Sequence, residues 1–294
     1  MEIVHTPVMK DEVLSFLAPV SGSPLMIDCT TGEGGHTEAF LERYDELKVI
    51  GLDRDAAIQR KAVERLQRFK ERFTPVNCWF DEYLKGVDDE SADMILFDLG
   101  ISVFHYVESQ RGFSFRGDEK LDMRLDAGQR LSAETVVNEY PEDELADLIY
   151  HYSEERYSRR IARRIVEERA KERIETASRL AEIVASAVPP QYRYGRISPA
   201  TRTFQAIRIE VNGELERITP ALEQAVRVLR KGGRIAVITF HSLEDRPVKW
   251  FFKDLASQGR VKILTKHPVV ASEEECRVNP PSRSAKLRVV EKCF

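Results

Sequence analysis

The sequence predicts an α/β protein whose parallel sheet is interrupted by a helical insertion. Near the N-terminus, short apolar runs alternate with helical patterns, which is typical of right-handed βαβ units. From about residue 105 to residue 211 the patterns are helical, and strand character returns at residues 234–240, after the turn Lys231-Gly232-Gly233. We therefore expect a discontinuous α/β core of residues 1–105 and 212–294, with residues 106–211 inserted as a helical domain.

Four strands and two helices are expected before the insertion. The strands are residues 25–28, 48–53, 73–78 and 92–98, and the last is apolar along almost its whole length, as in a strand covered on both faces. The first helix spans about 36–44. The second begins after Asp55, whose carboxylate can cap it, and runs to about Lys70. Its apolar face is expected to comprise Ile58, Ala62, Val63, Leu66 and Phe69.

The chain after the insertion completes the predicted sheet. A helix near residues 243–256 follows the strand at 234–240, and Ser242 can cap this helix with Asp245 as an imperfect capping-box partner. Residues 261–265 and 286–291 are expected to form an antiparallel hairpin with a long connection.

Composition limits the classes of protein that this chain can be. Hydrophobic residues make up 42% and charged residues 32%, as in a folded domain with an apolar core. No apolar run approaches the roughly 20 residues of a membrane span, and residues 1–7 lack a signal-peptide pattern, so we expect a cytoplasmic protein with no membrane partner. The cysteines form no CxxC pair and the histidines no HExxH motif, so no metal site is predicted. The net charge of −4 disfavours a generally basic nucleic-acid binder, although cations gathered on one face can still bind phosphate.

Glycines and a carboxylate follow the first predicted strand, at the edge where open parallel sheets bind ligands. Asp28 ends the strand, and Gly32, Gly34 and Gly35 lie in the next turn, where glycine lets the backbone approach a ligand. This is not the G-x-G-x-x-G spacing of a dinucleotide site, which disfavours a nicotinamide-dependent oxidoreductase. A strand-terminal carboxylate opposes phosphate but suits the amino or sulfonium group of S-adenosylmethionine.

Three further strand ends fit the same cofactor. Asp53 ends the second strand, where a carboxylate can accept hydrogen bonds from ribose hydroxyls. Phe80, after the third strand, can form an apolar wall for adenine, and Asp98 ends the fourth strand at the ligand edge. Taken alone, the glycine turn can be a plain loop and Asp53 a surface acid, but the four strand ends together favour cofactor binding.

Sequence blocks spread along the chain carry a family resemblance. They are His5-Thr6-Pro7-Val8, Gly34-Gly35-His36, Leu52-Asp53-Arg54-Asp55, Phe97-Asp98-Leu99-Gly100, Arg111-Gly112-Phe113-Ser114-Phe115, Leu121-Asp122-Met123-Arg124, Tyr157-Ser158-Arg159-Arg160-Ile161-Ala162, Ala200-Thr201-Arg202-Thr203-Phe204-Gln205-Ala206-Ile207-Arg208 and Thr239-Phe240-His241-Ser242-Leu243-Glu244-Asp245-Arg246. In these blocks and in their order the chain closely resembles the ribosomal RNA small subunit methyltransferase H family.

The resemblance implies a reaction, a fold and a set of contacts. It implies S-adenosylmethionine-dependent methylation of the N4 amine of a cytidine in the decoding centre (P site) of 16S rRNA in the small ribosomal subunit. The implied fold is a Rossmann-like class I methyltransferase sheet with an inserted helical domain. The implied cofactor contacts are Gly34, Gly35, His36, Asp53, Phe80 and Asp98. One position departs from the family, because His105 stands where the family usually has a glutamine that contacts the cofactor. Imidazole can donate or accept as an amide does, but it is shorter and can titrate.

The segment after the fourth strand is the candidate for catalysis. The exocyclic amine of cytosine is a poor nucleophile, so it must be positioned against the methyl group and its developing positive charge stabilised. The segment contains no Asp/Asn-Pro-Pro-aromatic turn, and Asp98 and Ser102 stand in its place. Asp98 can equally serve the cofactor alone. Phe104, Tyr106 and Phe113 can stack on the target base, or Phe113 and Phe115 can be core anchors of the insertion.

Arginines in the insertion predict a surface for RNA. Arg156, Arg160, Arg163 and Arg164 would form one basic stripe on a helix, with Arg193 and Arg196 extending the positive character. The residues assigned to RNA are Arg111, Arg159, Arg160, Arg163, Arg164, Arg202, Arg208 and His241. The alternative is a solvated helix whose arginines pair with Glu154, Glu155, Glu167 and Glu168.

Two other functions stay open from the sequence. One is a methyltransferase with a different acceptor, and the other is an RNA-binding or ribosome assembly factor that binds the cofactor without turnover. The oligomeric state is also open, a homodimer included.

Overall fold

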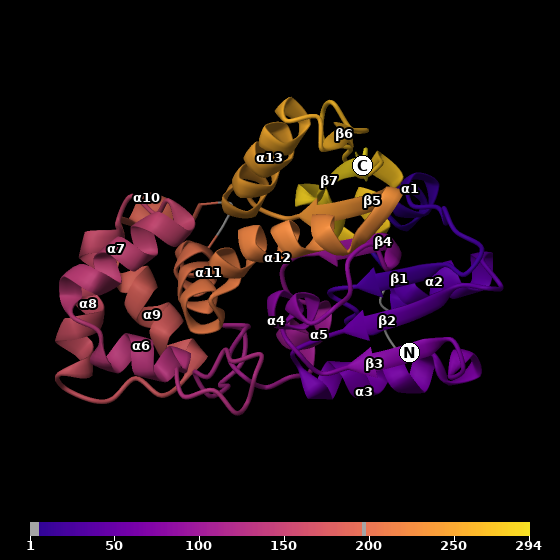
Figure 1. Cartoon of the computed structure of the whole chain (residues 1–294). Coiled ribbons are helices and arrows are strands. Elements are labelled where there is room, and N and C mark those ends of the chain that lie inside the picture. Colours follow the sequence, from indigo (N-terminus) through magenta and orange to yellow (C-terminus); the bar gives the residue numbers. More distant parts are fainter. Residues whose placement is uncertain (1–5, 196–197) are drawn as a thin grey trace. The chain divides into compact units, whose positions relative to one another are not determined.

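The computed structural model describes residues 6–195 and 198–294, and their contacts divide the chain into two compact units. The first unit runs to Gly100 and resumes at Leu215–Phe294, and the second is Ile101–Glu214. Figure 1 shows the first unit as strands and helices and the second as helices joined by loops. Among the described residues, no helix is both long and apolar enough to cross a membrane.

A seven-stranded sheet forms the centre of the first unit, in the order β3-β2-β1-β4-β5-β7-β6. The strands are β1 (Leu25–Asp28), β2 (Lys48–Leu52), β3 (Phe73–Val76), β4 (Ala92–Asp98), β5 (Leu229–Thr239), β6 (Val261–Ile263) and β7 (Lys286–Lys292). Strands β1 to β5 pair in parallel, while β7 lies antiparallel between β5 and β6. The chain reverses its direction of winding between β1 and β4, and such a switch point is where open α/β sheets bind ligands. The prediction of a Rossmann-like class I methyltransferase sheet with inserted helices is confirmed.

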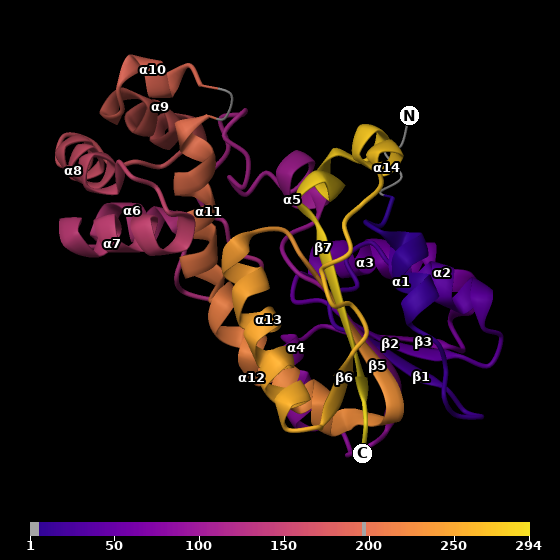
Figure 2. The same cartoon turned by 90° about the horizontal axis from the view of Figure 1, so that it is seen from above.

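Two layers of helices cover the sheet, because β4 and its neighbours bear apolar side chains on both faces. One face packs against α1 (Lys10–Phe16), α2 (Gly35–Arg43) and the turn that follows α3 (Ala56–Arg65), through Leu66 and Phe69. The other face packs against α4 (Phe80–Lys85), α12 (Glu214–Val228) and α13 (Ser242–Ser257). Figure 2 shows these two layers on opposite sides of the strands.

Strand β5 begins earlier than expected. The turn predicted at Lys231-Gly232-Gly233 lies inside the strand as a bulge, since Leu229 pairs with Ala92 and Arg234 with Met94. Gly232 takes the left-handed region (φ 77°), and a Cβ on Gly233 would lie 2.7 Å from the carbonyl oxygen of Asp93. Glycines therefore permit the extra residues of the bulge. The predicted antiparallel pairing of the last two strands is confirmed, with α14 (Glu273–Val278) and a short 3-10 turn, η2 (Pro280–Ser284), in their connection.

Helix α3 is shorter than the sequence predicted. Asp55 caps it as expected, its carboxylate accepting from the N–H of Ala57 at 2.8 Å. The helix ends at Arg65, and a 3-10 turn, η1 (Gln67–Phe69), follows. Val63 was wrongly assigned to the buried face: it is 43% exposed, because it lies about 100° further round the helix than Ala62.

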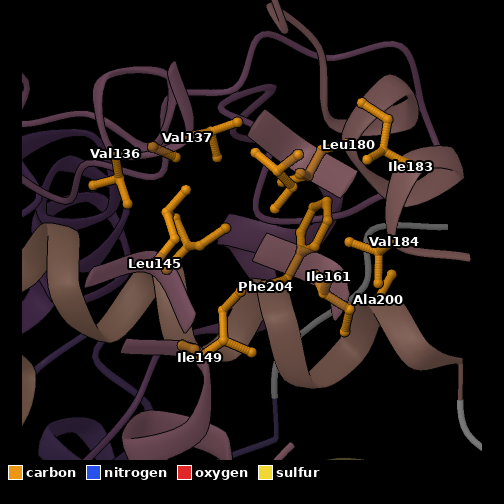
Figure 3. Close-up of a cluster of buried hydrophobic side chains, with 14 of the residues drawn as sticks. Val136, Val137, Leu145, Ile149, Ile161, Leu180, Ile183, Val184, Ala200 and Phe204 are labelled. Carbon is orange, nitrogen blue, oxygen red and sulfur yellow. The ribbon is translucent and has the colours of Figure 1, made fainter. Parts of the chain in front are cut away.

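The second unit is helical and has its own core. Its helices are α5 (Val103–Val107), α6 (Ala133–Glu139), α7 (Glu142–Ser153), α8 (Ser158–Arg169), α9 (Ala177–Ala187), α10 (Pro190–Arg193) and α11 (Pro199–Asn212). Over residues 101–195 and 198–214, extended pairing is limited to the single bridge between Lys120 and Thr176. Figure 3 shows Ile149, Ile161 and Phe204 pointing into this core, which Phe113 also joins.

Candidate cofactor site and nucleic-acid surface

Asp28, at the end of β1, holds the glycine turn against helix α2. Its carboxylate accepts from the Oγ1 of Thr37 at 2.7 Å and from the N–H of Thr30 at 3.2 Å, and it is 1% exposed. Burial raises the pKa of this carboxyl above its usual value, and the Thr37 hydrogen bond partly offsets that effect. Asp28 therefore faces the start of a helix, and its first role is to order the turn.

The glycine turn links the ends of β1 and β2. Gly32 and Gly34 both lie in the left-handed region (φ 54° and 82°), and Gly34 is the N-cap of α2. A Cβ on Gly34 would lie 3.0 Å from the Leu66 side chain, so the position suits glycine for space as well as for conformation. The N–H of Gly32 donates to Oδ2 of Asp53 at 3.0 Å, and the N–H of Asp55 donates to Oδ1 at 2.8 Å. Asp53 thus stands beside the turn, as the cofactor prediction requires.

His36 and Asp98 meet at the switch point. The Nε2 of His36 lies 3.5 Å from Oδ2 of Asp98, and the N–H of Asp98 donates to the Oγ1 of Thr30 at 2.6 Å. Within residues 6–195 and 198–294, both ring nitrogens of His36 and the Oδ1 of Asp98 are buried without a hydrogen-bond partner. An unsatisfied buried polar group costs about 1–3 kcal/mol, so these atoms are suited to partners from a ligand.

The donor set indicates what kind of ligand fits. Carboxylates at Asp53 and Asp98 and an imidazole at His36 lie around the glycine turn. Carboxylates accept from hydroxyls and ammonium groups and repel phosphate. An adenosyl group with a sulfonium and an amino acid end therefore fits this site, and a pyrophosphate does not.

The predicted adenine wall is more deeply buried than expected. Phe80 starts α4 and is 9% exposed, with its ring edge-on to Phe97 at 5.5 Å in the core. Trp79 is the more accessible ring and stacks beneath the guanidinium of Arg217 at 4.2 Å, which also binds Asp81 at 2.7 Å. The role of Phe80 at adenine stays a prediction.

Ser102 and His105 belong to the second unit. The Oγ of Ser102 accepts from the N–H of Phe104 at 3.2 Å and caps α5, so its hydroxyl has a structural partner. His105 is 4% exposed, and its ring contacts those of Phe104 and Phe113 at 5.5 and 5.2 Å. Their catalytic and cofactor roles stay predictions, and for Phe113 the structure shows the core position.

Two of the arginines assigned to RNA hold the second unit together. Arg111 donates to the carbonyl of Arg124 at 2.7 Å. Arg208 is 9% exposed and forms a two-pronged ion pair with Glu214, with both distances at 2.9 Å. Burial and pairing direct the charge of Arg208 inward, so we do not include it in the proposed RNA surface.

The predicted basic stripe on α8 is only partly formed. Arg156 lies before the helix, so it was wrongly included, and it stacks on Tyr157 and Tyr192 at 4.8 and 4.9 Å. Arg163 lies 3.5 Å from Glu142, and Arg164 lies 3.2 Å and 3.1 Å from two acids of its own helix, Glu167 and Glu168. Arg202 lies 3.9 Å from Glu155, whereas Arg159 and Arg160 are exposed. Arg193 is the last residue of α10, and Arg196 lies outside the described residues. Ion pairing and RNA binding thus both remain compatible with this surface.

His241, not Ser242, caps helix α13. The Nδ1 of His241 accepts from the N–H of Glu244 at 3.4 Å, while the Glu244 carboxylate accepts from the N–H of His241 at 3.3 Å. The capping box is therefore shifted by one residue from the prediction. Asp245 instead pairs with Arg288 of β7, at 2.6 and 3.0 Å. The RNA role of His241 stays a prediction.

Sequence reasoning missed the hydroxyls of Thr30 and Thr37, which bind Asp98 and Asp28. The signal was present, because both threonines flank the glycine turn that follows a strand-terminal carboxylate. Each supplies a donor or acceptor that a buried strand end needs.

Comparison with known proteins places the chain among methylases. The model of the MraW methylase family matches residues 2–293. A protein of Treponema denticola named ribosomal RNA small subunit methyltransferase H is 53% identical, over 99% of this chain and 98% of its own length. A protein of the same name from Persephonella marina is 47% identical, over 99% of both. A solved rRNA methylase structure from Streptococcus thermophilus is 11% identical, with a TM-score of 0.46, over 97% of this chain and 94% of its own.

Proposed function

The chain belongs to the MraW methylase family, and from this premise we propose that it methylates RNA of the small ribosomal subunit with S-adenosylmethionine as donor. The relatives' shared name supports this substrate. More finely, we propose that the acceptor is the N4 amine of a cytidine in the decoding centre (P site) of 16S rRNA, as the family resemblance of the sequence implies. Such a substrate is cytoplasmic, and we propose the same compartment for the protein.

The observation that carries the proposal is the buried pair of His36 and Asp98 at the switch point, with polar atoms that lack partners among the described residues. Around this pair, Gly34 and Gly35 form the tight turn that packs against Leu66 and Pro7. Asp53, beside the turn, is the residue proposed to accept from the ribose hydroxyls. Phe80 completes the proposed cofactor set. The bound cofactor supplies an electrophilic methyl group.

Asp98 is the residue proposed to act on the acceptor amine. Its Oδ1 is buried and lacks a partner within the described part of the chain, and its backbone is held by Thr30. The cytosine amine has a delocalised lone pair, so it gains positive charge as its new bond to carbon forms. A fixed carboxylate stabilises that charge and can accept an amine hydrogen, and such preorganised groups contribute several kcal/mol in a dry site. The base must first leave its stack, which is a requirement for chemistry on a paired or stacked base.

A methyl-transfer assay tests the proposal. Purified protein, tritiated S-adenosylmethionine and small subunits from a strain lacking the enzyme are expected to give labelled RNA, in which nucleoside mass spectrometry finds N4-methylcytidine. Label in another nucleoside would support methyl transfer to RNA but refute the N4 amine of cytidine as the acceptor. Cofactor binding without label in any small-subunit RNA would refute the proposal and favour an RNA-binding factor without turnover.

A further inference from the structure

Helix α13 carries an unusually exposed tryptophan. Trp250 is 59% exposed, although the same helix buries Val248 and Phe252 against the sheet. Tryptophan is normally well buried because its large ring gains much from leaving water. Indole rings are enriched where proteins meet other molecules, and this one stands exposed in the middle of a 16-residue helix.

Two lysines accompany the ring. The Nζ of Lys249 lies 5.5 Å from the centre of the Trp250 ring, and the Nζ of Lys253 lies 5.2 Å from it. Both distances are those of cation–π contacts. Arg246 is one turn earlier on the exposed side, and Asp254, an exposed acid one turn later, accepts a hydrogen bond from Gln258 at 2.7 Å. The face thus combines a flat aromatic surface with several cations.

The charge of this face is less neutralised than that of α8. In the described part of the chain, neither Lys249 nor Lys253 has a carboxylate within the 4.0 Å of an ion pair, whereas Arg163 and Arg164 of α8 both do. Lys249 is close enough to Asp245 to contribute to its lowered pKa, but that carboxylate is bound by Arg288. The positive charge beside Trp250 is therefore directed to solvent.

We propose that this face of α13 binds a single-stranded segment of the substrate RNA, with Trp250 stacked on an unpaired base and Lys249 and Lys253 at the neighbouring phosphates. Stacking of bases on aromatic side chains beside basic groups is how proteins hold single strands, and it tolerates any base. An acidic peptide would use the lysines but would leave the indole face without a partner. The inference rests on the proposed function for the identity of the RNA.

The position of Trp250 also shows that it does not contact the reacting nucleotide. Helix α13 begins at Ser242, directly after β5, whose end lies at the ligand edge of the sheet. At 1.5 Å per residue, Trp250 is about 12 Å further along the helix. The stacked base is therefore a different nucleotide from the one whose amine reacts, and the contact positions the RNA for the reaction.

Binding of a short fluorescein-labelled single-stranded oligoribonucleotide, followed by anisotropy, tests the surface. Trp250→Ala is expected to weaken binding by roughly five- to 150-fold, the equivalent of about 1–3 kcal/mol per stacked base, and Trp250→Phe to restore most of it. Lys249→Gln with Lys253→Gln is expected to lower the slope of log affinity against log salt by about 1.4, since each phosphate contact on a single strand contributes about 0.7. The chain has two tryptophans, so the difference in quenching between wild type and Trp250→Phe reports Trp250 itself.

Matched controls separate the possible outcomes. Lys48→Gln with Lys70→Gln removes the same charge from exposed lysines elsewhere in the first unit and should leave the slope near that of wild type. Unchanged affinity and slope in the α13 variants, with normal methylation of small subunits by wild type, would overturn the surface and leave the proposed function standing. If the α13 variants bind the oligonucleotide more weakly but the wild-type protein methylates no rRNA, the RNA-binding surface stands and the proposed function falls. A change in sedimentation without a change in RNA affinity would assign the face to a second copy and also overturn the inference.

Discussion

The buried ion pair between Asp245 and Arg288 gives the sharpest stability prediction. The two residues are 8% and 9% exposed, and they join helix α13 to strand β7 through contacts of 2.6 and 3.0 Å. Removing one partner of a buried pair typically costs about 3–5 kcal/mol, because the other charge is left without compensation. Because the neighbouring charges differ, removing Asp245 and removing Arg288 are expected to cost different amounts of stability.

Asp245→Asn leaves the Arg288 guanidinium buried without its acid and is expected to cost the full range of about 3–5 kcal/mol. Arg288→Gln leaves Asp245 with Lys286, whose Nζ is 3.8 Å away and 41% exposed, so a smaller loss of roughly 2–3 kcal/mol is expected. The double variant should lose less than the sum, because the two substitutions remove the same interaction.

Urea unfolding of the full chain measures these losses as shifts in midpoint at constant slope. Glu134→Gln is the matched control: its carboxylate also lies 2.6 Å from an arginine, Arg173, but that pair is 37% and 49% exposed and should contribute at most about 1 kcal/mol. A larger loss for Arg288→Gln than for Asp245→Asn, or a loss for Glu134→Gln equal to either, would refute the reasoning from burial.

The pair also predicts the dependence of stability on pH. Burial tends to raise the pKa of Asp245, but hydrogen bonding to Arg288 and the charges of Arg288, Lys286 and Lys249 outweigh it, so the pKa lies below its usual value. The pair's contribution is therefore complete above the unfolded value of about 3.9 and is lost as pH falls through the lower folded value. Asp245→Asn should be less sensitive to acid over that interval, and an unchanged acid profile would contradict the assignment.

Three further outcomes are expected. Asp98→Asn should lower single-turnover methylation by at least 100-fold, on the order of one lost electrostatic contact at the reacting atom, with a melting temperature close to that of wild type; normal turnover would remove Asp98 from the reaction. Gly112→Ala should destabilise the second unit by roughly 2–4 kcal/mol in urea unfolding, because φ is 74° and the new Cβ would lie 2.3 Å from the carbonyl oxygen of Lys120; a neutral effect would mean that the loop relaxes. Replacing four arginines of α8 together by glutamine should weaken RNA binding and flatten its salt dependence; the four are Arg159, Arg160, Arg163 and Arg164. The effect should be smaller than for four unpaired cations, because Arg163 and Arg164 are ion-paired. A slope equal to that of wild type would exclude this helix from the RNA surface.

Much of the candidate cofactor site was predictable because its information is local. A carboxylate at the end of an apolar run marks the ligand edge in the sequence itself, and Asp28, Asp53 and Asp98 were found in this way. Strands β1 and β4 have the predicted bounds, since continuous apolar runs between polar ends are strong signals. The hydroxyls of Thr30 and Thr37 were overlooked although they flank the glycine turn, because their partners, the backbone N–H of Asp98 and the Asp28 carboxylate, are known only from the fold.

Residue roles that depend on burial and on side-chain pairing were not predictable. Arg208 has the same sequence signal as an RNA-binding arginine, and only the fold brings it to Glu214 in a buried pair. His241 and Ser242 are adjacent candidates for one cap, and the geometry at the end of β5 selects His241. Patterns in a chain specify elements and the ends of strands, because periodicity and turn chemistry are short-range. Burial depends on residues far apart in the sequence, and so does a pair such as Asp245 and Arg288, so the tertiary structure alone decides which cations face the solvent and which hold the core.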